Sequence, residues 1–160
     1  QSQNLEDVDT SGLELSFSSK LTDTLSFSYD MIRISGESDG APLSSLSPDQ
    51  AIIGLKHLSR DEKFSVNFYL SMVDKSFSNF TGTCGRSGSE CLTLPDREIF
   101  DLYASYKFND HLELNVALKN LSDHKFWDWS TVNGFAADDA NLDLWLEPGR
   151  NTNVSLRISF

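Results

Sequence analysis

Apolar and polar residues alternate with a period of two along most of the chain. The pattern is clearest over residues 64–72, where Phe, Val, Phe, Leu and Met alternate with Ser, Asn, Tyr and Ser. A period of two is that of a β-strand with one apolar face, and the i, i+3, i+4 pattern of amphipathic helices is almost missing. The sequence therefore predicts an all-β fold. Seven antiparallel strands of roughly ten residues are expected near 13–18, 25–31, 50–58, 64–72, 100–108, 112–119 and 153–160.

The connections between these strands differ in length in a regular way. Short turns are expected after the first, third and fifth strands, and long loops rich in Gly, Ser, Asp and Pro near residues 35–48, 75–95 and 121–147. Outer-membrane barrels have short turns at one end and long loops at the other. A tilted strand also needs about 9–11 residues to cross a bilayer. Both features favour an antiparallel transmembrane β-barrel segment.

The two faces of the expected strands differ in chemistry. One face is dominated by Leu, Phe, Val and Ile, and the other by Ser, Asn and charged residues, which suits a hydrated or plugged lumen. Aromatic residues such as Tyr106, Phe108 and Trp145 gather toward strand ends, as in the aromatic girdles of membrane barrels. A soluble β-sandwich that binds through its loops stays open as the alternative, because its core would also need an apolar face.

The charge balance and the missing motifs exclude several functions. The chain has 13 basic and 24 acidic residues, a net charge of 13 − 24 = −11, so nucleic acid is excluded as a partner. No phosphate loop or nucleophile motif occurs, so no catalytic residues and no enzymatic activity are expected. No built metal site is expected either, because the acidic run near 138–143 lacks the Gly and Glu positions of a calcium loop; a divalent cation that bridges these carboxylates to anionic lipid stays open as an alternative.

The two cysteines, Cys84 and Cys91, are separated by six small or polar residues. No nearby Cys or His completes a set of four metal ligands. The spacing favours a disulfide that closes a loop, and with it an oxidising compartment.

Two motifs near the C-terminus resemble those of TonB-dependent outer-membrane receptors. Residues 100–123 resemble their penultimate hairpin, which closes with Asn120, Leu121, Ser122 and Asp123. The run Pro148, Gly149, Arg150 and Asn151, followed by alternation to a terminal aromatic residue, resembles their final strand. In that family the terminal strand is a signal for the barrel-assembly machinery; the matching residues are Val154, Leu156, Ile158 and Phe160.

The resemblance implies an architecture and a location. Residues 1–160 would form the last seven strands of a 22-stranded, plugged barrel in the bacterial outer membrane. The plug domain and the N-terminal barrel strands would lie outside this chain. An odd number of strands leaves two sheet edges unpaired, so a fragment or one piece of a split receptor is expected. The implied partners are outer-membrane lipid or lipopolysaccharide, and TonB through the plug.

One branch of the family is similar over the loop that precedes the last strand. Residues 125–135, with Trp127, Trp129 and Gly134, resemble the ending of haem and haemoglobin receptors, although Asn133 and Trp145 depart from that branch. The resemblance implies that haem, free or from haemoproteins, is the transported ligand, with no cofactor bound by this segment. A ferric siderophore or another nutrient is the alternative cargo.

Three residues of this loop are candidates for contact with cargo. His124, Trp127 and Trp129 could bind or stack on a porphyrin, since imidazole is a common axial ligand of haem. Packing within the loop or in an aromatic girdle is the competing interpretation of all three. His57 and His111 are expected on the lipid face and in a short turn, away from cargo.

Overall fold

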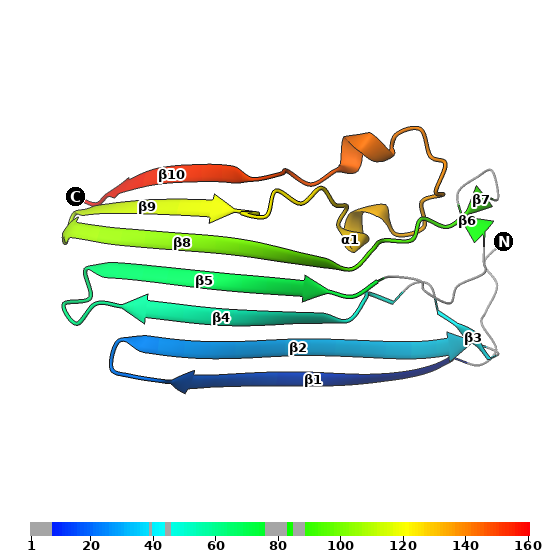
Figure 1. The fold of residues 1–160 in the computed structure, drawn as a ribbon, viewed down its shortest axis with the longest axis horizontal. Coiled ribbons are helices and arrows are strands. Elements are labelled where there is room, and N and C mark those ends of the chain that lie inside the picture. The colour runs from blue at the N-terminus through cyan, green and yellow to red at the C-terminus, as the bar shows by residue number, and fades with distance from the viewer. Residues whose placement is uncertain (1–7, 39, 44–45, 76–82, 85–88) are drawn as a thin grey trace.

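The structure is a computed structural model that describes residues 8–38, 40–43, 46–75, 83–84 and 89–160. Seven long antiparallel strands form one sheet, and each strand pairs with its neighbour in sequence (Figure 1). They confirm the predicted all-β fold and strand number. The strands are β1 (Val8–Lys20), β2 (Leu25–Ser38), β4 (Gln50–Leu58), β5 (Phe64–Val73), β8 (Arg97–Asn109), β9 (Leu112–Lys119) and β10 (Asn151–Ile158).

The remaining elements are short and lie in the long connections. β3 (Ala41–Pro42) pairs with β2, and β6 (Thr83–Cys84) pairs with β7 (Ser89–Glu90). The last long connection carries the helices α1 (Trp129–Val132) and η1 (Leu142–Trp145), each four residues long. In the described part of the chain, no helix is long and apolar enough to span a membrane.

Short and long connections lie at opposite ends of the sheet (Figure 1). Residues 21–24, 59–63 and 110–111 link paired strands at the end where the C-terminus also lies. The described parts of the long connections, residues 40–43, 46–49, 74–75, 83–84, 89–96 and 120–150, lie at the other end. We call these the turn end and the loop end. The asymmetry predicted from the connection lengths is confirmed.

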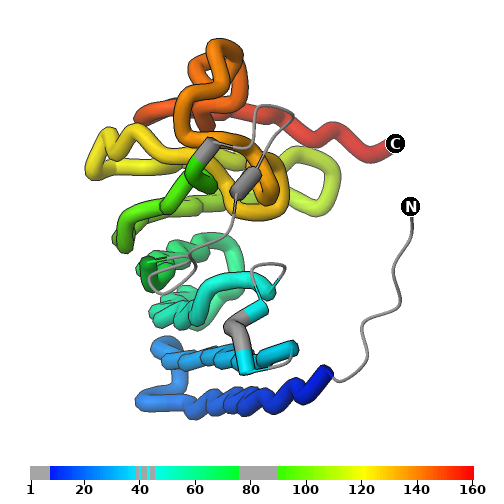
Figure 2. The backbone as a smooth tube through the Cα atoms, turned by 90° about the vertical axis from the view of Figure 1, so that its right-hand side faces the viewer, coloured from blue at the N-terminus to red at the C-terminus, as the bar shows by residue number. Residues whose placement is uncertain are grey.

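The long strands form a single layer, seen along their axes in Figure 2. The register places large apolar residues side by side on one face, as in the row Phe27, Leu55, Phe68, Leu102 and Leu118 across five strands. This apolar face is not covered by another sheet of the described residues, since the only other sheet is the pair β6–β7. The described residues thus provide no second sheet of the kind that a soluble β-sandwich would pack on this face.

Several strand boundaries differ from the predicted ones, and the largest differences are at β1, β2, β8 and β10. β2 continues to Ser38, whereas residues 35–48 were expected to be a loop. Beyond Met31 the alternation reverses, because Ile32 and Ile34 lie on the polar face while Arg33 lies on the apolar one. This reversal hides the strand from a pattern search. At the other terminus β10 runs from Asn151 to Ile158, so the expected strand 153–160 begins and ends two residues too late, and Phe160 is fully exposed beyond it.

Candidate functional site

Two long connections meet at the loop end and pack on each other. The backbone N–H of Leu92 donates to the carbonyl of Phe135 (2.9 Å), and that of Ala137 donates to the carbonyl of Glu90 (2.8 Å). These two bonds flank an isolated antiparallel bridge between Cys91 and Ala136. Residues 89–96 and 120–150 therefore form one unit, which we call the cap.

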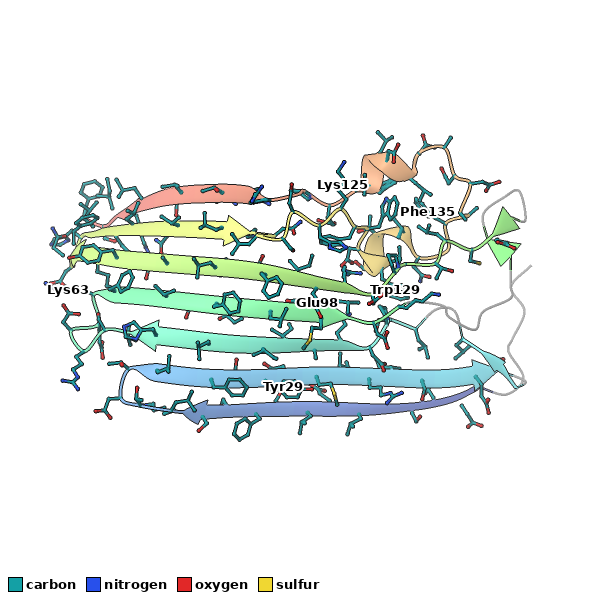
Figure 3. All side chains as sticks on the ribbon, in the orientation of Figure 1. Tyr29, Lys63, Glu98, Lys125, Trp129 and Phe135 are labelled. Atoms are coloured by element: carbon teal, nitrogen blue, oxygen red, sulfur yellow. The ribbon has the colours of Figure 1, made fainter. Side chains whose placement is uncertain are left out.

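The cap has a small apolar core of its own. Leu94, Val132 and Ala136 are buried, with 2%, 2% and 4% of their surface exposed. The rings of Phe135 and Trp145 meet edge to face at 6.0 Å, which joins α1 and η1. Figure 3 shows Phe135 and Trp129 together in this part of the molecule. Burial of these side chains away from water favours the packing of the two connections on each other.

Arg97, the first residue of β8, joins the cap to the sheet. By strand alternation it lies on the polar face with Asp101 and Tyr103. It is 8% exposed, its Nη2 atom lies 3.4 Å from Oδ2 of Asp128, and its guanidinium stacks over the Phe126 ring at 4.8 Å. The cap therefore leans over the polar face at the loop end. A buried arginine needs such partners, because an unpaired buried charge is costly.

Asp128 serves two elements at once. Its Oδ1 atom accepts the backbone N–H of Ser130 (3.0 Å) and so caps the N-terminus of α1. Its Oδ2 atom faces Arg97. The start of the helix is thus fixed against the rim of the sheet.

Asn120 closes the base of the cap with both its backbone and its amide. Its backbone N–H donates to Oδ1 of Asp101 (2.8 Å), and its Nδ2 donates to the carbonyl oxygens of His124 (2.8 Å) and Pro148 (3.3 Å). Its Oδ1 accepts the backbone N–H of His124 (2.9 Å). Asn120 is buried and has a φ of 51°, a left-handed conformation that Asn tolerates better than most residues. This explains why the asparagine of the motif stands at this position.

The second half of the motif ties the two ends of the connection together. Oδ1 of Asp123 accepts the backbone N–H of Arg150 (2.8 Å), although the two residues are 27 apart in sequence. A Cβ atom on Gly149 would lie 2.7 Å from the same oxygen, so glycine permits this approach. The residues of both sequence motifs therefore form one closed base, at which the 120–150 connection leaves and rejoins the sheet.

The two tryptophans of the predicted motif lie within the cap. Nε1 of Trp127 donates to the carbonyl of Leu142 (2.8 Å), and Trp127 also forms an isolated bridge with Leu146. Nε1 of Trp129 is buried without a hydrogen-bond partner. Gly134 follows α1 with a φ of 82°, which glycine adopts without strain. The contacts of Trp127 fit loop packing, and a role of either tryptophan toward cargo stays a prediction.

The three histidines lie in three different parts of the molecule. His124 is exposed at the base of the cap, and its role toward cargo also stays a prediction. The His57 ring lies beside Phe64 on the apolar face, with 6.5 Å between centroids. Nδ1 of His111 lies 3.1 Å from the carbonyl of Ser159 at the turn end. His57 and His111 thus occupy the places expected from the sequence.

The remaining predicted residues are placed as follows. The side chain of Cys84 lies outside the described residues, so the disulfide with Cys91 stays a prediction. Val154, Leu156 and Ile158 line up on the apolar face of β10, opposite Val116, Leu114 and Leu112. Among the described residues, no group of three or more His, Cys, Asp and Glu side chains could hold a metal ion.

Sequence reasoning missed the residues that position the cap. Arg97 and Asp128 are not singled out in the sequence analysis, and Leu94 and Val132 fall in segments that are expected there to be loops. One signal was available for Arg97. Polar residues of β8 alternate in the sequence at positions 101, 103 and 105, and Arg97 stands an even number of residues before them. It therefore continues the polar face of β8 beyond the predicted start at residue 100.

Known proteins place this sheet in a family. The family model described as TonB dependent receptor-like, beta-barrel matches residues 1–121. The chain belongs to the TonB-dependent receptor β-barrel family. Members of this family are outer-membrane receptors for transport, and the apolar face of this chain is accordingly its lipid-facing surface. Among the curated proteins compared with the chain, none matches it.

Solved structures of TonB-dependent receptors share the fold. The copper transporter OprC aligns with a TM-score of 0.77 and 20% identity over 96% of this chain and 24% of its own. The ferripyoverdine receptor of the outer membrane of Pseudomonas aeruginosa gives 0.71 and 21% over 96% and 20%. The ferric-catecholate import receptor Fiu from E. coli K12 gives 0.65 and 12% over 96% and 21%. The chain thus spans between a fifth and a quarter of these proteins.

Proposed function

We propose that this chain is the C-terminal part of a TonB-dependent receptor that imports an iron chelate across the outer membrane. The observation that carries the proposal is the cap, which leans over the polar face of a family-assigned barrel sheet through Arg97 and Asp128. In a closed barrel the polar face surrounds the lumen. The cap therefore lies where an incoming ligand would first meet the receptor.

The proposed cargo is a ferric siderophore. Two of the similar structures are the ferripyoverdine receptor and the ferric-catecholate import receptor Fiu. The similarity to these structures concerns the fold. The cargo of this chain is our inference from the ligands of receptors with the same fold. In the complete receptor, TonB would act through a plug inside a 22-stranded barrel.

Haem is the second candidate cargo, and a sequence feature favours it. Residues 125–135 resemble the ending of haem and haemoglobin receptors. Phe126 and Trp127 lie in the cap, and Trp145 next to Phe135 is 46% exposed. An exposed indole can stack on a porphyrin as well as on a catechol ring. Ligand titration separates the two candidates.

This chain would contribute three things to transport. The sheet supplies part of the barrel wall, the cap supplies a ligand-facing surface, and β10 supplies the strand that the barrel-assembly machinery would recognise. Asn120 and Asp123 hold the base of the cap, so its tip is presented from a fixed frame. Such a frame reduces the conformational entropy lost when a ligand binds.

The test is a titration of the intact receptor that carries this chain, purified in detergent. Ferripyoverdine, ferric enterobactin and haem are added separately, and binding is followed by tryptophan fluorescence and, for haem, the Soret band. Saturable binding of a ferric siderophore supports the proposal, and binding of haem alone selects the second candidate. No binding of any of them by a folded barrel contradicts iron-chelate import.

A matched pair of variants locates the binding surface. Trp145→Ala changes an exposed aromatic residue of the cap, and Phe108→Ala changes an exposed aromatic residue at the turn end. We expect Trp145→Ala to weaken binding about tenfold, as for loss of one aromatic contact of about 1.4 kcal/mol. Phe108→Ala should leave affinity unchanged. Equal effects would show that the cap is not the ligand-facing surface.

A further inference from the structure

The cap carries mostly one sign of charge. Its two parts, residues 89–96 and 120–150, contain eight acidic residues and two basic ones, Lys125 and Arg150. With Arg97, which joins the cap to the sheet, the sum is 3 − 8 = −5. The net charge of the whole chain is −11, so the cap and Arg97 account for almost half of it.

The part of the cap that follows α1 contains no basic residue. We call residues 133–147 the η1 segment. Its charged residues are all acidic, and they are Asp138, Asp139, Asp143 and Glu147. Arg97 interacts electrostatically with Glu147 as well as with Asp128. Counted with Asp128 and with the cations Arg97 and Lys125, the segment carries 2 − 5 = −3, so the field around it is negative.

Two large apolar side chains are exposed on the same segment. Leu144 is 80% exposed and Trp145 is 46% exposed, whereas Leu94 and Val132 are buried in the core of the cap. The contact with Phe135, which Figure 3 labels, fixes the Trp145 ring while part of its surface stays accessible. Adjacent exposed Leu and Trp side chains on a part that meets water are typical of a binding surface, and Trp attracts cations more strongly than other aromatic residues.

The carboxylates of the η1 segment do not form a metal site within the described part of the chain. No group of three or more His, Cys, Asp and Glu side chains there could hold a metal ion. Asp139 is used locally, because its Oδ1 accepts the backbone N–H of Asn141 (2.8 Å). The carboxylates therefore act on a ligand through their common field, and the exposed Leu144 and Trp145 require that ligand to be partly apolar.

We propose that the cap binds a cationic ferric chelate, in which an ammonium or guanidinium group lies at the η1 segment. The cation interacts with the indole of Trp145 and with the negative field around it, and an apolar part of the chelate covers Leu144. The same field repels a multiply anionic chelate such as a ferric tricatecholate. The inference rests on the proposed function, because it assigns the charge of the cargo that the cap contacts.

A matched pair of chelates tests the charge. Ferrioxamine B is a ferric trihydroxamate with a free ammonium group, and its N-acetyl derivative lacks that charge. Both chelates, and ferric enterobactin, are titrated into the intact receptor in detergent, and binding is followed by tryptophan fluorescence. We expect ferrioxamine B to bind about tenfold more tightly than the N-acetyl form at low salt, and the difference to shrink as added salt screens the field.

The outcomes separate this inference from the proposed function. Equal affinities of the matched pair, or tighter binding of ferric enterobactin, would overturn the inference and leave iron-chelate import in place. Binding of ferric enterobactin only after Mg²⁺ is added would also overturn it, because a divalent cation would then bridge the carboxylates to an anionic ligand. No binding of any chelate by a folded barrel contradicts import itself, and the inference falls with it.

A charge reversal locates the effect. Asp143 is exposed in the first turn of η1, and Asp110 lies in a turn at the opposite end of the sheet. Asp143→Lys should weaken binding of ferrioxamine B about tenfold and leave that of the N-acetyl form unchanged, whereas Asp110→Lys should change neither. Asp143→Asn should have the same effect by a smaller factor. Damage to the cap would weaken both chelates equally, so the readout is the ratio of their affinities; an unchanged ratio in Asp143→Lys would overturn the inference.

A second pair of variants tests the contact with the indole. Trp145→Leu removes the aromatic ring but keeps an apolar side chain, and Leu144→Ala shortens the exposed side chain next to it. Trp145→Leu should lower the preference for ferrioxamine B over its N-acetyl form about threefold. Leu144→Ala should weaken binding of both chelates alike and keep the preference, because it removes only apolar area. The same preference in both variants would overturn the contact between the ring and the cation.

Discussion

The sheet and the cap are built from the same chain but bury their apolar residues in opposite ways. Among the residues that the structure describes, the buried aliphatic side chains are Val73, Leu94, Val132 and Ala136, and three of these four belong to the cap. In the sheet, large residues such as Phe17, Leu55 and Leu156 are exposed. The cap has a small apolar core of its own, whereas the sheet exposes its large apolar side chains.

The difference follows from the solvent around each region. The sheet of an outer-membrane receptor meets lipid, so an exposed leucine loses nothing by facing outward. The cap meets water, so Leu94 and Val132 must be covered by their own neighbours. Near the loop end the change is visible within single strands, because Ile32 and Val73 lie on the otherwise polar face. Apolar residues thus move from the lipid-facing face to the opposite face of the sheet where the surroundings change from lipid to water.

The largest effect should come from a charge placed on the lipid face. Val116→Arg puts a guanidinium in the middle of this face, and Asn115→Arg puts one beside it on the polar face. We expect Val116→Arg to lower the free energy of unfolding by about 3 kcal/mol and Asn115→Arg by much less. Urea unfolding of the intact receptor in liposomes measures both. Equal losses would mean that the two faces meet the same solvent.

The base of the cap should show the next largest effect. Asn120→Ala removes the amide that bonds His124 and Pro148 and places alanine at a φ of 51°. We expect the cap to lose about 2 kcal/mol of local stability, from unsatisfied backbone groups and from backbone strain. Hydrogen exchange of residues 120–150, followed by mass spectrometry, reports this loss.

Asn120→Gly provides the control for that prediction. Glycine relieves the strain but restores none of the hydrogen bonds. It should recover only part of the protection, while the exchange of β8 and β9 stays unchanged. Full recovery with glycine would assign the whole effect to the backbone and none to the amide.

A pair of valines compares the two regions directly. Val132 is buried in the cap with 2% exposure, and Val154 faces lipid from β10. Val132→Ala should cost the cap about 1.5 kcal/mol, because it leaves a cavity. Val154→Ala should cost under about 0.5 kcal/mol, because lipid fills the space. Hydrogen exchange and urea unfolding provide the two values, and a reversed order would contradict the assignment of solvents.

The smallest effect is expected at the turn end. The Ser59 hydroxyl donates to Oδ1 of Asp61 (2.6 Å), and the backbone N–H of Lys63 also donates to it; these bonds lower the pKa of Asp61 below its ordinary value. A depressed carboxyl pKa stabilises the turn above the pKa of the unfolded chain. This stabilisation is lost as the pH falls through the folded value.

Ser59→Ala tests this contribution. The variant should raise the Asp61 pKa toward its ordinary value, which NMR titration of the carboxyl group would detect. Arg60→Ala, in the same turn, leaves the two hydrogen bonds in place and serves as the control. An unchanged Asp61 pKa in Ser59→Ala would rule out the hydroxyl as its main cause.

Most of the sheet could be predicted from the sequence, because apolar and polar residues alternate along most of its strands, the end of β2 beyond Met31 excepted. Residues such as Phe68 and Leu102 follow a local period of two, and no distant contact is needed to find them. The motif residues Asn120 and Gly149 were also found, through resemblance. Their structural role could not be predicted. They close the base of the cap, where Asp123 and Arg150 are joined across 27 residues, and this closure depends on long-range hydrogen bonds.

The rest of the cap has no local pattern to read. Leu94 and Ala136 are buried, and Ala136 pairs with Cys91, 136 − 91 = 45 residues away in sequence, so this arrangement depends on tertiary contacts. Arg97 was missed because a charged residue at a strand end is usually solvated. Its burial depends on Phe126 and Asp128, which come from another connection.

The most direct test of this assignment of solvents is spin labelling along β8 in the intact receptor, reconstituted in liposomes. Labels at residues 99–105, one at a time, are exposed to oxygen, which partitions into lipid, and to a water-soluble nickel chelate. We predict that accessibility alternates, with residues 100, 102 and 104 favouring oxygen and residues 101, 103 and 105 shielded from lipid. Uniform accessibility along the strand, or the opposite alternation, would contradict a lipid-facing apolar sheet.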